Sequence, residues 1–227
     1  MDKISRKRKC IVTFARSWHG LAATRCLGKH GIYVISGDVD AIAAANFSRH
    51  SREQFVYPDP DADPEGFVDK LLAVAKAHAS PDTDLVLMPI FTDIYPILCR
   101  KERFDGLAKL ALPPREVYEL VRSKGRLATY CRKHRIRMPP TSVVRSAKEF
   151  YACARKTKYP AFVKMPAGSA GIGIRNVSSC EEAISVFHDM SQFYNIVDPE
   201  LLPIIQTSVD GEDYCSTFLF DHGECRA

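Results

Sequence analysis

The stretch Ala161–Asn176 reads AFVKMPAGSAGIGIRN, and the fold and the function are best approached from it. A short apolar run that contains Lys164 is followed by a loop of small residues, and a second apolar run begins at Ile174. This order predicts two strands joined by a glycine-rich loop. Glycines let backbone N–H groups approach a polyanion closely, and a neighbouring lysine supplies a mobile positive charge. The stretch therefore predicts a phosphate site on a hairpin, away from any helix N-terminus.

Two well-known phosphate-binding loops do not fit this stretch. A Walker loop ends in Gly-Lys-Ser or Gly-Lys-Thr, and a dinucleotide fingerprint requires a helix where a strand is expected here. A plain flexible hairpin without a ligand is the simpler alternative. Against it, Lys164 lies inside an apolar strand, where an unpaired charge is costly if it is buried. We therefore expect an anionic partner.

The composition is that of a folded protein with one large domain or two small ones. The chain has 227 residues, a hydrophobic content of 46% and a net charge of +5. Basic residues gather in the segment 124–137, which we interpret as a solvated helix face. A nucleic-acid surface would need a basic stripe with interleaved aromatic residues, and only Tyr130 is present in this segment. We expect no nucleic-acid partner.

The cysteines and the apolar runs point to a cytoplasmic protein. The eight cysteines are spaced singly, without a Cys-x-x-Cys pair, which argues against a zinc site or thioredoxin-like chemistry. A reduced compartment fits such usage. The apolar run near the N-terminus is about six residues long, too short for a signal peptide. No run approaches the roughly 20 residues of a membrane span, so no membrane contact is expected.

Strands and helices alternate in the first half of the chain. The expected strands cover residues 10–15, 32–36, 85–90 and 108–112, and the expected helices cover 21–29, 65–79 and 93–101. This alternation predicts a parallel, Rossmann-like α/β sheet. After Pro113-Pro114 the pattern changes to α+β with antiparallel character. Helices are expected over 115–121, 123–134, 146–156 and 178–193, and further strands over 141–145, 201–209 and 214–220. We predict two domains, 1–112 and 113–227.

The turn after the first strand, residues 13–20, is a second candidate ligand site. Ligands of open α/β sheets bind at the carboxyl ends of the strands. A conventional dinucleotide site with Asp38 as the ribose-binding acid is disfavoured, because the turn has one glycine and several bulky residues. The turn after the 85–90 strand should lie at the same edge. The candidate substrate contacts at this edge are Arg16, Trp18, His19, Thr92 and Asp93.

The second half resembles the ATP-grasp superfamily through an ordered set of motifs. Residues 123–127 (SKGRL) resemble the helix with the first nucleotide-binding lysine, and residues 136–141 (IRMPPT) resemble the segment leading into the first lobe. Residues 159–166 (YPAFVKMP) resemble the strand with the second lysine, and the glycine loop resembles the phosphate lid. Residues 204–214 resemble the interlobe hinge. The first half resembles the Rossmann-like domain that precedes the grasp, so the resemblance covers essentially the whole chain.

The resemblance implies an ATP site. Lys124 and Lys164 would bind the α- and β-phosphates. The loop residues that would cover the transferred phosphates are Gly168, Ser169, Ala170, Gly171 and Gly173. The hinge residues that would hold adenine and ribose are Gln206, Thr207, Val209, Glu212 and Asp213. Gln206 stands where many members have a glutamate, and its carbonyl can still accept a hydrogen bond from the adenine amine.

The resemblance also implies a further lobe that supplies acidic and asparagine ligands for Mg²⁺ and an arginine on the transferred phosphate. We expect these groups beyond residue 227, so the chain is expected to be a truncated form or a fragment. It then contains no metal ligand and no catalytic residue of its own, and it should turn over ATP weakly or not at all. The cofactors that the resemblance implies are ATP and Mg²⁺.

The leading expectation is the ATP-binding part of a ligase in which a carboxylate attacks the γ-phosphate of ATP and an amine displaces phosphate from the acyl phosphate. Its partners would be ATP, a small carboxylate and an amine, and a homodimer is one candidate assembly. Three alternatives stay open. They are an ATP-grasp carboxylase or carbamoyl-phosphate-type enzyme, a non-catalytic nucleotide-binding module, and a dinucleotide-dependent oxidoreductase that uses the first half.

Overall fold

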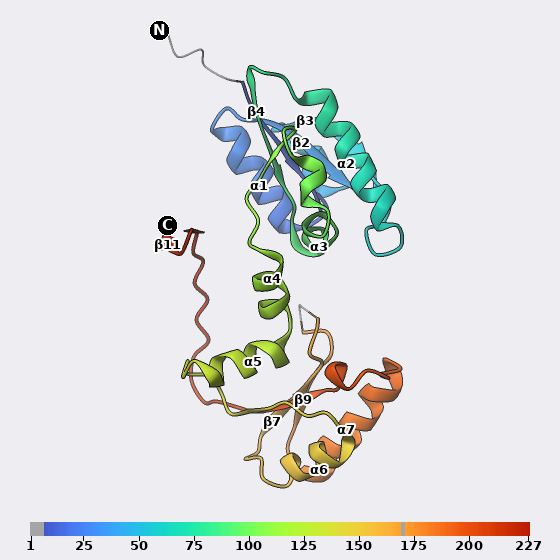
Figure 1. Cartoon of the computed structure of the whole chain (residues 1–227), viewed down its shortest axis with the longest axis vertical. Coiled ribbons are helices and arrows are strands. Elements are labelled where there is room, and N and C mark those ends of the chain that lie inside the picture. The colour runs from blue at the N-terminus through green and yellow to red at the C-terminus, as the bar shows by residue number, and fades with distance from the viewer. Residues whose placement is uncertain (1–6, 169–170) are drawn as a thin grey trace. The chain divides into compact units, whose positions relative to one another are not determined.

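The computed structural model describes residues 7–168 and 171–227. The chain divides into two compact units, Met1–Arg115 and Glu116–Ala227. Figure 1 traces the elements of both units, and each unit has its own sheet.

The first unit contains a five-stranded sheet in the order β3-β2-β1-β4-β5, and every neighbouring pair is parallel. Its strands are β1 (Lys7–Val12), β2 (Tyr33–Asp38), β3 (Ser51–Val56), β4 (Thr83–Met88) and β5 (Lys109–Leu110). Its helices are α1 (Trp18–Lys29), α2 (Pro64–His78) and α3 (Ile94–Leu98). Short 3₁₀ turns cover Ala44–Phe47, Phe91–Asp93 and Lys101–Phe104.

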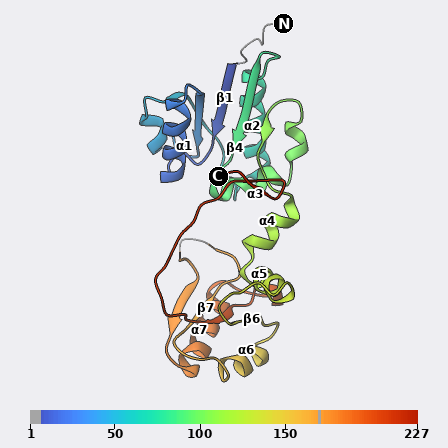
Figure 2. The same ribbon diagram turned by 90° about the vertical axis from the view of Figure 1, so that its left-hand side faces the viewer.

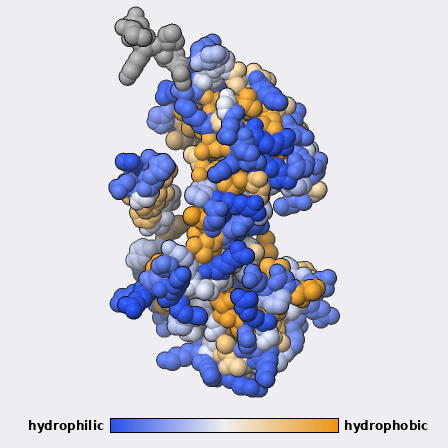
Figure 3. Space-filling view, viewed as in Figure 1, coloured by the Kyte–Doolittle hydropathy of each residue, from blue (hydrophilic) through white to orange (hydrophobic). Residues whose placement is uncertain are grey.

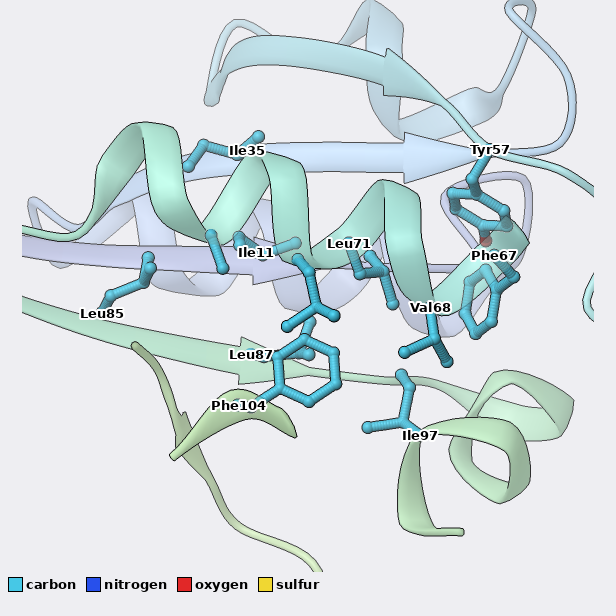
Figure 4. Packing of buried hydrophobic residues seen from close by; sticks show 12 residues of the cluster. Ile11, Ile35, Tyr57, Phe67, Val68, Leu71, Leu85, Leu87, Ile97 and Phe104 are labelled. Atoms are coloured by element: carbon cyan, nitrogen blue, oxygen red, sulfur yellow. The ribbon is translucent and has the colours of Figure 1, made fainter. Parts of the chain in front are cut away.

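Helices cover both faces of this sheet, and the alternation along β1 shows why its sequence is apolar throughout. Cys10 and Val12 belong to the cluster that packs against α1, whereas Ile11 belongs to the larger core formed with α2. Figure 4 shows Ile11 beneath α2, near Leu71. A strand that is buried on both sides has no polar face to alternate with. The continuous apolar run is therefore the direct signature of this two-sided packing.

A buried polar cluster joins the loops at the carboxyl ends of β1, β3 and β4. The Tyr57 hydroxyl donates a hydrogen bond to Asp93 Oδ2 (2.5 Å) and accepts one from the backbone N–H of Phe14 (2.9 Å). Phe14 and Phe91 have left-handed φ angles of 54° and 59°, and their rings stack with centroids 5.5 Å apart. Left-handed backbone is strained for such residues, so the buried hydrogen bonds help to hold both loops in place.

The second unit contains a four-stranded antiparallel sheet in the order β6-β9-β7-β8. Its strands are β6 (Thr141–Ser142), β7 (Ala161–Lys164), β8 (Ile174–Val177) and β9 (Ile204–Thr207). Its helices are α4 (which begins at Arg115 and ends at Arg122), α5 (Lys124–Lys133), α6 (Ala147–Ala154) and α7 (Cys180–Phe193), and a 3₁₀ turn covers Pro199–Leu201. A small hairpin, β10 (Phe220–Asp221) with β11 (Glu224–Cys225), lies near the C-terminus.

The two faces of this sheet have different coverings. Ala161 and Val163 of β7 are fully buried in a core that includes Phe150 of α6 and Phe187 of α7, whose rings stack with centroids 4.1 Å apart. Figures 1 and 2 show α6 and α7 on one side of β7 and β9, with α5 on the other. Since side chains alternate along a strand, Lys164 points away from the α6–α7 core.

The predicted fold class is confirmed, but several elements differ from expectation, and the strands expected over 141–145 and 201–209 are shortened to β6 and β9. Residues 214–220 were expected to form a strand, but this exposed segment has no regular structure until β10 begins at Phe220. The sequence prediction missed β3, an edge strand that reads SREQFV and is mostly exposed, because it lacks an apolar run. The helix expected over 93–101 is shortened to α3, with a 3₁₀ turn on each side.

None of the helices in residues 7–168 and 171–227 combines the length and apolar character that crossing a bilayer requires. All eight cysteines are free thiols. Apolar and polar residues are interspersed over the surface that Figure 3 shows.

The substitution Asp93→Asn should flatten the pH dependence of stability of the first unit. Burial is the main cause that raises the pKa of Asp93 above its ordinary value of 3.8. The part of the free energy of unfolding that depends on the neutral Asp93 carboxyl is therefore fully present below the unfolded-state pKa. It is lost as the pH rises through the folded-state pKa. Urea unfolding from acidic to neutral pH should show this decline in the wild type and a smaller one in the variant. The exposed Asp61→Asn serves as the control, and equal declines in all three proteins would contradict the prediction.

Candidate phosphate site

The start of α5 is fastened to the glycine loop. The Ser123 hydroxyl caps the helix by accepting a hydrogen bond from the backbone N–H of Arg126 (3.3 Å). The backbone N–H of Lys124 donates to the carbonyl of Pro166 (2.9 Å), and Lys124 Nζ donates to the carbonyl of Gly168 (2.9 Å). The helix cap thus places Lys124 directly against the loop, although the two segments are about forty residues apart in the sequence.

Lys164 is held by a chain of hydrogen bonds that crosses three strands. Its Nζ donates to Gln206 Oε1 on β9 (2.6 Å), and Gln206 Nε2 donates to the Thr141 hydroxyl on β6 (2.7 Å). The register explains these contacts, since Gln206 lies opposite Phe162 on one side and Thr141 on the other. Lys164 Nζ also lies 5.0 Å from the centroid of the Phe162 ring, on the same face of β7.

The electrostatics of the two lysines favour an anionic ligand. Partial burial lowers the pKa of Lys164, and burial followed by the charge of Lys164 lowers the pKa of Lys124. Both ammonium groups bond to neutral oxygen atoms, and in the described part of the chain neither has a carboxylate partner. An anion placed between them would stabilise both charges. The two lysines and the open glycine backbone therefore fit a phosphate group.

The glycine loop adopts backbone that other residues rarely adopt. Gly168, Gly171 and Gly173 have φ angles of 121°, 79° and 70°. The Met165 N–H donates to the Gly173 carbonyl (2.7 Å) and closes the hairpin. A Cβ atom at Gly173 would lie 2.7 Å from Met165 Cγ, whereas one at Gly171 would meet no atom within 4 Å. Gly173 is therefore required by the hairpin itself, and Gly171 leaves open space. Ser169 and Ala170 lie outside the described residues.

The structure brings together only part of the predicted hinge. Gln206 contacts Lys164, and Thr207 is tied to the neighbouring segment by its N–H bond to the Pro140 carbonyl (3.0 Å). Val209, Glu212 and Asp213 lie in the exposed segment that follows β9. Within residues 7–168 and 171–227, no hydrogen bond or ion pair connects these three residues to either lysine, and Glu212 instead accepts from the Tyr214 hydroxyl (2.6 Å).

The candidate substrate contacts of the first unit fall into two groups. Trp18, His19 and Thr92 are exposed, and the Trp18 side chain is 83% accessible. Asp93 is fully buried in the Tyr57 cluster, so it supports the loops and does not reach a ligand at the surface. We therefore do not retain Asp93 as a substrate contact.

Arg16 is partly neutralised by the residue that the sequence suggested as a ribose acid. Its backbone N–H and its guanidinium bond to the two carboxylate oxygens of Asp38, at 2.7 Å and 2.6 Å. Its guanidinium carbon also lies 4.4 Å from the centroid of the Phe14 ring. Asp38 is fully buried, so its role here is to fix the turn after β1.

Sequence reasoning missed Thr141 and Tyr57. Thr141 became relevant only because β6 lies beside β9, and this pairing joins segments more than sixty residues apart. Tyr57 follows the missed strand β3, so no local signal linked it to Asp93.

Within residues 7–168 and 171–227, no group of three or more His, Cys, Asp or Glu side chains could hold a metal ion. The described residues therefore do not fit a Mg²⁺ site of their own. The donors that they offer near the lysines suit an anion.

Comparisons with known proteins identify the fold. No family model matches the sequence, and no curated protein matches it. The biotin carboxylase domain of 2-oxoglutarate carboxylase from Hydrogenobacter thermophilus, crystallised with MgADP and bicarbonate, matches 90% of this chain with a TM-score of 0.66 and 16% identity. N5-carboxyaminoimidazole synthetase from Staphylococcus aureus, complexed with ADP, matches 92% with a TM-score of 0.65 and 13% identity. An L-amino acid ligase from Bacillus licheniformis matches 91% with a TM-score of 0.62 and 16% identity.

This chain covers 45%, 50% and 45% of those three structures, in the same order. All three are ATP-grasp enzymes. The chain therefore has the fold of the ATP-grasp enzymes, over about half of the length of the structures that it matches.

Proposed function

We propose that this chain binds the phosphates of ATP between Lys124, Lys164 and the glycine loop, as the nucleotide-binding part of an ATP-dependent carboxylate–amine ligase. The observation that carries the proposal is that Lys124 of α5 lies near enough to Lys164 of β7 for the charge of Lys164 to lower its pKa, while within the described residues neither ammonium group pairs with a carboxylate. Two unneutralised, partly buried cations are unfavourable in the free protein. A polyphosphate removes that cost and gains charge-assisted hydrogen bonds.

Gln206 and Lys164 would act together when the nucleotide binds. In the free protein Gln206 Oε1 accepts a hydrogen bond from Lys164 Nζ. Movement of Nζ onto a phosphate would release that oxygen, which could then accept from the adenine amine. The bond from Gln206 Nε2 to Thr141 would keep the amide oriented during the exchange. Phosphate capture and adenine recognition would then be linked through one side chain.

The reaction would be the attack of a carboxylate on the γ-phosphate and the displacement of phosphate by an amine. Such phosphoryl transfer relies on positioning and charge stabilisation rather than on covalent help from the protein. Lys124, Lys164 and the loop amides would supply part of that charge stabilisation. Mg²⁺ would accompany the phosphates, with ligands from outside the described residues. The exposed Trp18, His19 and Thr92, with Arg16, remain the proposed substrate contacts.

A carboxylase is the second candidate. One of the matching structures is a biotin carboxylase domain that holds MgADP and bicarbonate, whereas another is an amino acid ligase. In both the ligase and the carboxylase reaction, the two lysines would bind the phosphates of ATP. The identity of the carboxylate and of its acceptor distinguishes the two candidates, and a competition assay with bicarbonate and amino acids would separate them.

The substitution Lys164→Ala should weaken ATP binding by about tenfold or more, because it removes a charge-assisted hydrogen bond to a phosphate. Isothermal titration calorimetry with the chain of residues 1–227 measures the effect. Lys158→Ala is the matched control, since Lys158 is exposed and lies a few residues before β7. Equal ATP affinity of the wild type and Lys164→Ala would show that the lysine assignment is wrong, provided that thermal unfolding finds both proteins folded.

ATP affinity should also decline as the pH rises through the alkaline range. The pKa of both lysines is lowered, so they lose their protons at a lower pH than exposed lysines do. Bound phosphate favours the charged form and raises the pKa of each lysine, so binding should take up protons. Calorimetry at alkaline pH in two buffers of different ionisation enthalpy measures this uptake. Proton release on binding, or an uptake that persists in the Lys124→Ala/Lys164→Ala variant, would contradict the prediction.

A further inference from the structure

A second group of cations lies in the first unit, far along the chain from Lys124 and Lys164. A hollow of about 420 Å³ is formed by the last turns of α1 and the loop that leads into β3. Its wall consists of Arg25, Lys29, Phe47, Ser48, Arg49 and His50, and we call it the basic hollow. Arg25 and Lys29 lie four residues apart on α1, so their side chains emerge on the same face of the helix.

The charges with the largest effect on His50, in the wall of the basic hollow, are positive. Four cations act on His50, namely Arg49, Lys29, Arg52 and Arg25, and they lower the pKa of its imidazole after the first cause, which is desolvation. In the part of the chain that the structure describes, none of the four makes an ion pair. Like charges four residues apart also destabilise a helix. The four side chains are exposed, so water screens part of this repulsion, and an anion bound among them would relieve the rest.

The loop that carries His50 is fixed by its own packing. A Cβ atom at Gly28 would lie 2.5 Å from His50 Cβ and 2.7 Å from its Nδ1, so only glycine leaves room for His50 against α1. The His50 N–H donates to the hydroxyl of the largely buried Ser48 (3.3 Å), and the Ser51 N–H donates to the Ser48 carbonyl (2.9 Å). The loop part of the wall is therefore positioned before a ligand arrives, which lowers the ordering cost of binding.

The basic hollow and the proposed substrate contacts lie at opposite ends of the parallel strands. Helix α1 ends at Lys29 and β3 begins at Ser51, so the hollow is at the amino ends of the parallel strands. Arg16 follows β1 and Thr92 follows β4, which places both at the carboxyl ends. A ligand in the basic hollow would therefore be distinct from a substrate held at those contacts.

We propose that the basic hollow binds a small molecule that carries two or more phosphate groups. Its volume lies within the range of about 300–1,000 Å³ that is typical of small-molecule sites. Arginine guanidinium groups can bind phosphate oxygens in a bidentate manner, and two of the three cations that line the hollow are arginines, Arg25 and Arg49. The cations converge on one hollow, whereas a nucleic-acid surface needs a stripe with several aromatic side chains. One exposed aromatic residue, Phe47, lines the wall, with 77% of its surface accessible.

Inorganic pyrophosphate is the probe for this site, and calorimetry with the chain of residues 1–227 is the measurement. The titration is made in the Lys124→Ala/Lys164→Ala variant, so that the site proposed for ATP does not contribute. Adding Arg25→Gln and Arg49→Gln should weaken pyrophosphate binding by about tenfold or more. The matched control adds Lys70→Gln and Lys76→Gln, which remove the same charge from the exposed face of α2 and should leave the affinity unchanged.

The imidazole of His50 gives a second readout that does not depend on a destabilised variant. The charged groups that face it are Arg25 and Lys29 from α1, with Arg49 and Arg52 from its own segment. Bound pyrophosphate should raise the His50 pKa and shift its NMR titration to higher pH. The His50→Gln variant assigns the signal among the seven histidines of the chain.

Two results would overturn the proposal. One is an equal pyrophosphate affinity with and without Arg25→Gln and Arg49→Gln, together with an unshifted His50 titration. The other is tight binding of a single-stranded oligonucleotide while pyrophosphate does not bind, which would assign the cations to a nucleic-acid surface. Neither result bears on ATP binding at Lys124 and Lys164, because the residues are different.

Discussion

The proposed phosphate site depends on one arrangement, which is the position of β7 between β8 and β9. This pairing buries Ala161 and Val163 against α6 and α7 and leaves Lys164 on the other face, within reach of Gln206. The same hairpin carries the carbonyls that fasten the start of α5 and Lys124. Two neighbouring ammonium groups repel each other, so a stiff framework is needed to keep them together. Strand pairing on both sides of β7 provides that framework, and the apolar core behind the sheet stabilises it.

In the first unit, Arg16 at the carboxyl ends of the strands and the cations of the basic hollow at the amino ends differ in their ion pairing. At the carboxyl ends of the strands Arg16 is paired with Asp38, and the buried Tyr57–Asp93 contact holds the surrounding loops in strained backbone. At the amino ends, within the described residues, the cations of the basic hollow have no acidic partner. Arg16 is therefore neutralised locally, whereas the cations of the basic hollow keep their charge available. Because helices cover both faces of this sheet, the ends of its strands are the parts that are free for ligands.

Much of the fold could be predicted because its signals are local. The apolar run of β1 and the glycine hairpin each determine their own structure. The edge strand β3 was missed because an exposed edge does not require apolar residues, and the strand expected over 214–220 failed because its apolar residues are not buried. Lys164 could be singled out from its strand, but its contact with Gln206, and that of Gln206 with Thr141, depend on strand order. Strand order is set by long-range packing, so it cannot be predicted from residues that are close together in the sequence.

The glutamine at position 206 is consistent with this electrostatic arrangement. A glutamate, which many members of the superfamily that the sequence resembles have at this position, would also accept a hydrogen bond from Lys164, but it would form an ion pair with the lysine. Gln206 instead holds Lys164 through a neutral oxygen and anchors itself to Thr141 through its amide nitrogen, which a carboxylate could not do as a donor. The lysine is positioned without being neutralised, and the same principle applies to Lys124, which bonds to a backbone carbonyl. Neutral acceptors thus orient both cations and leave their charge for the ligand.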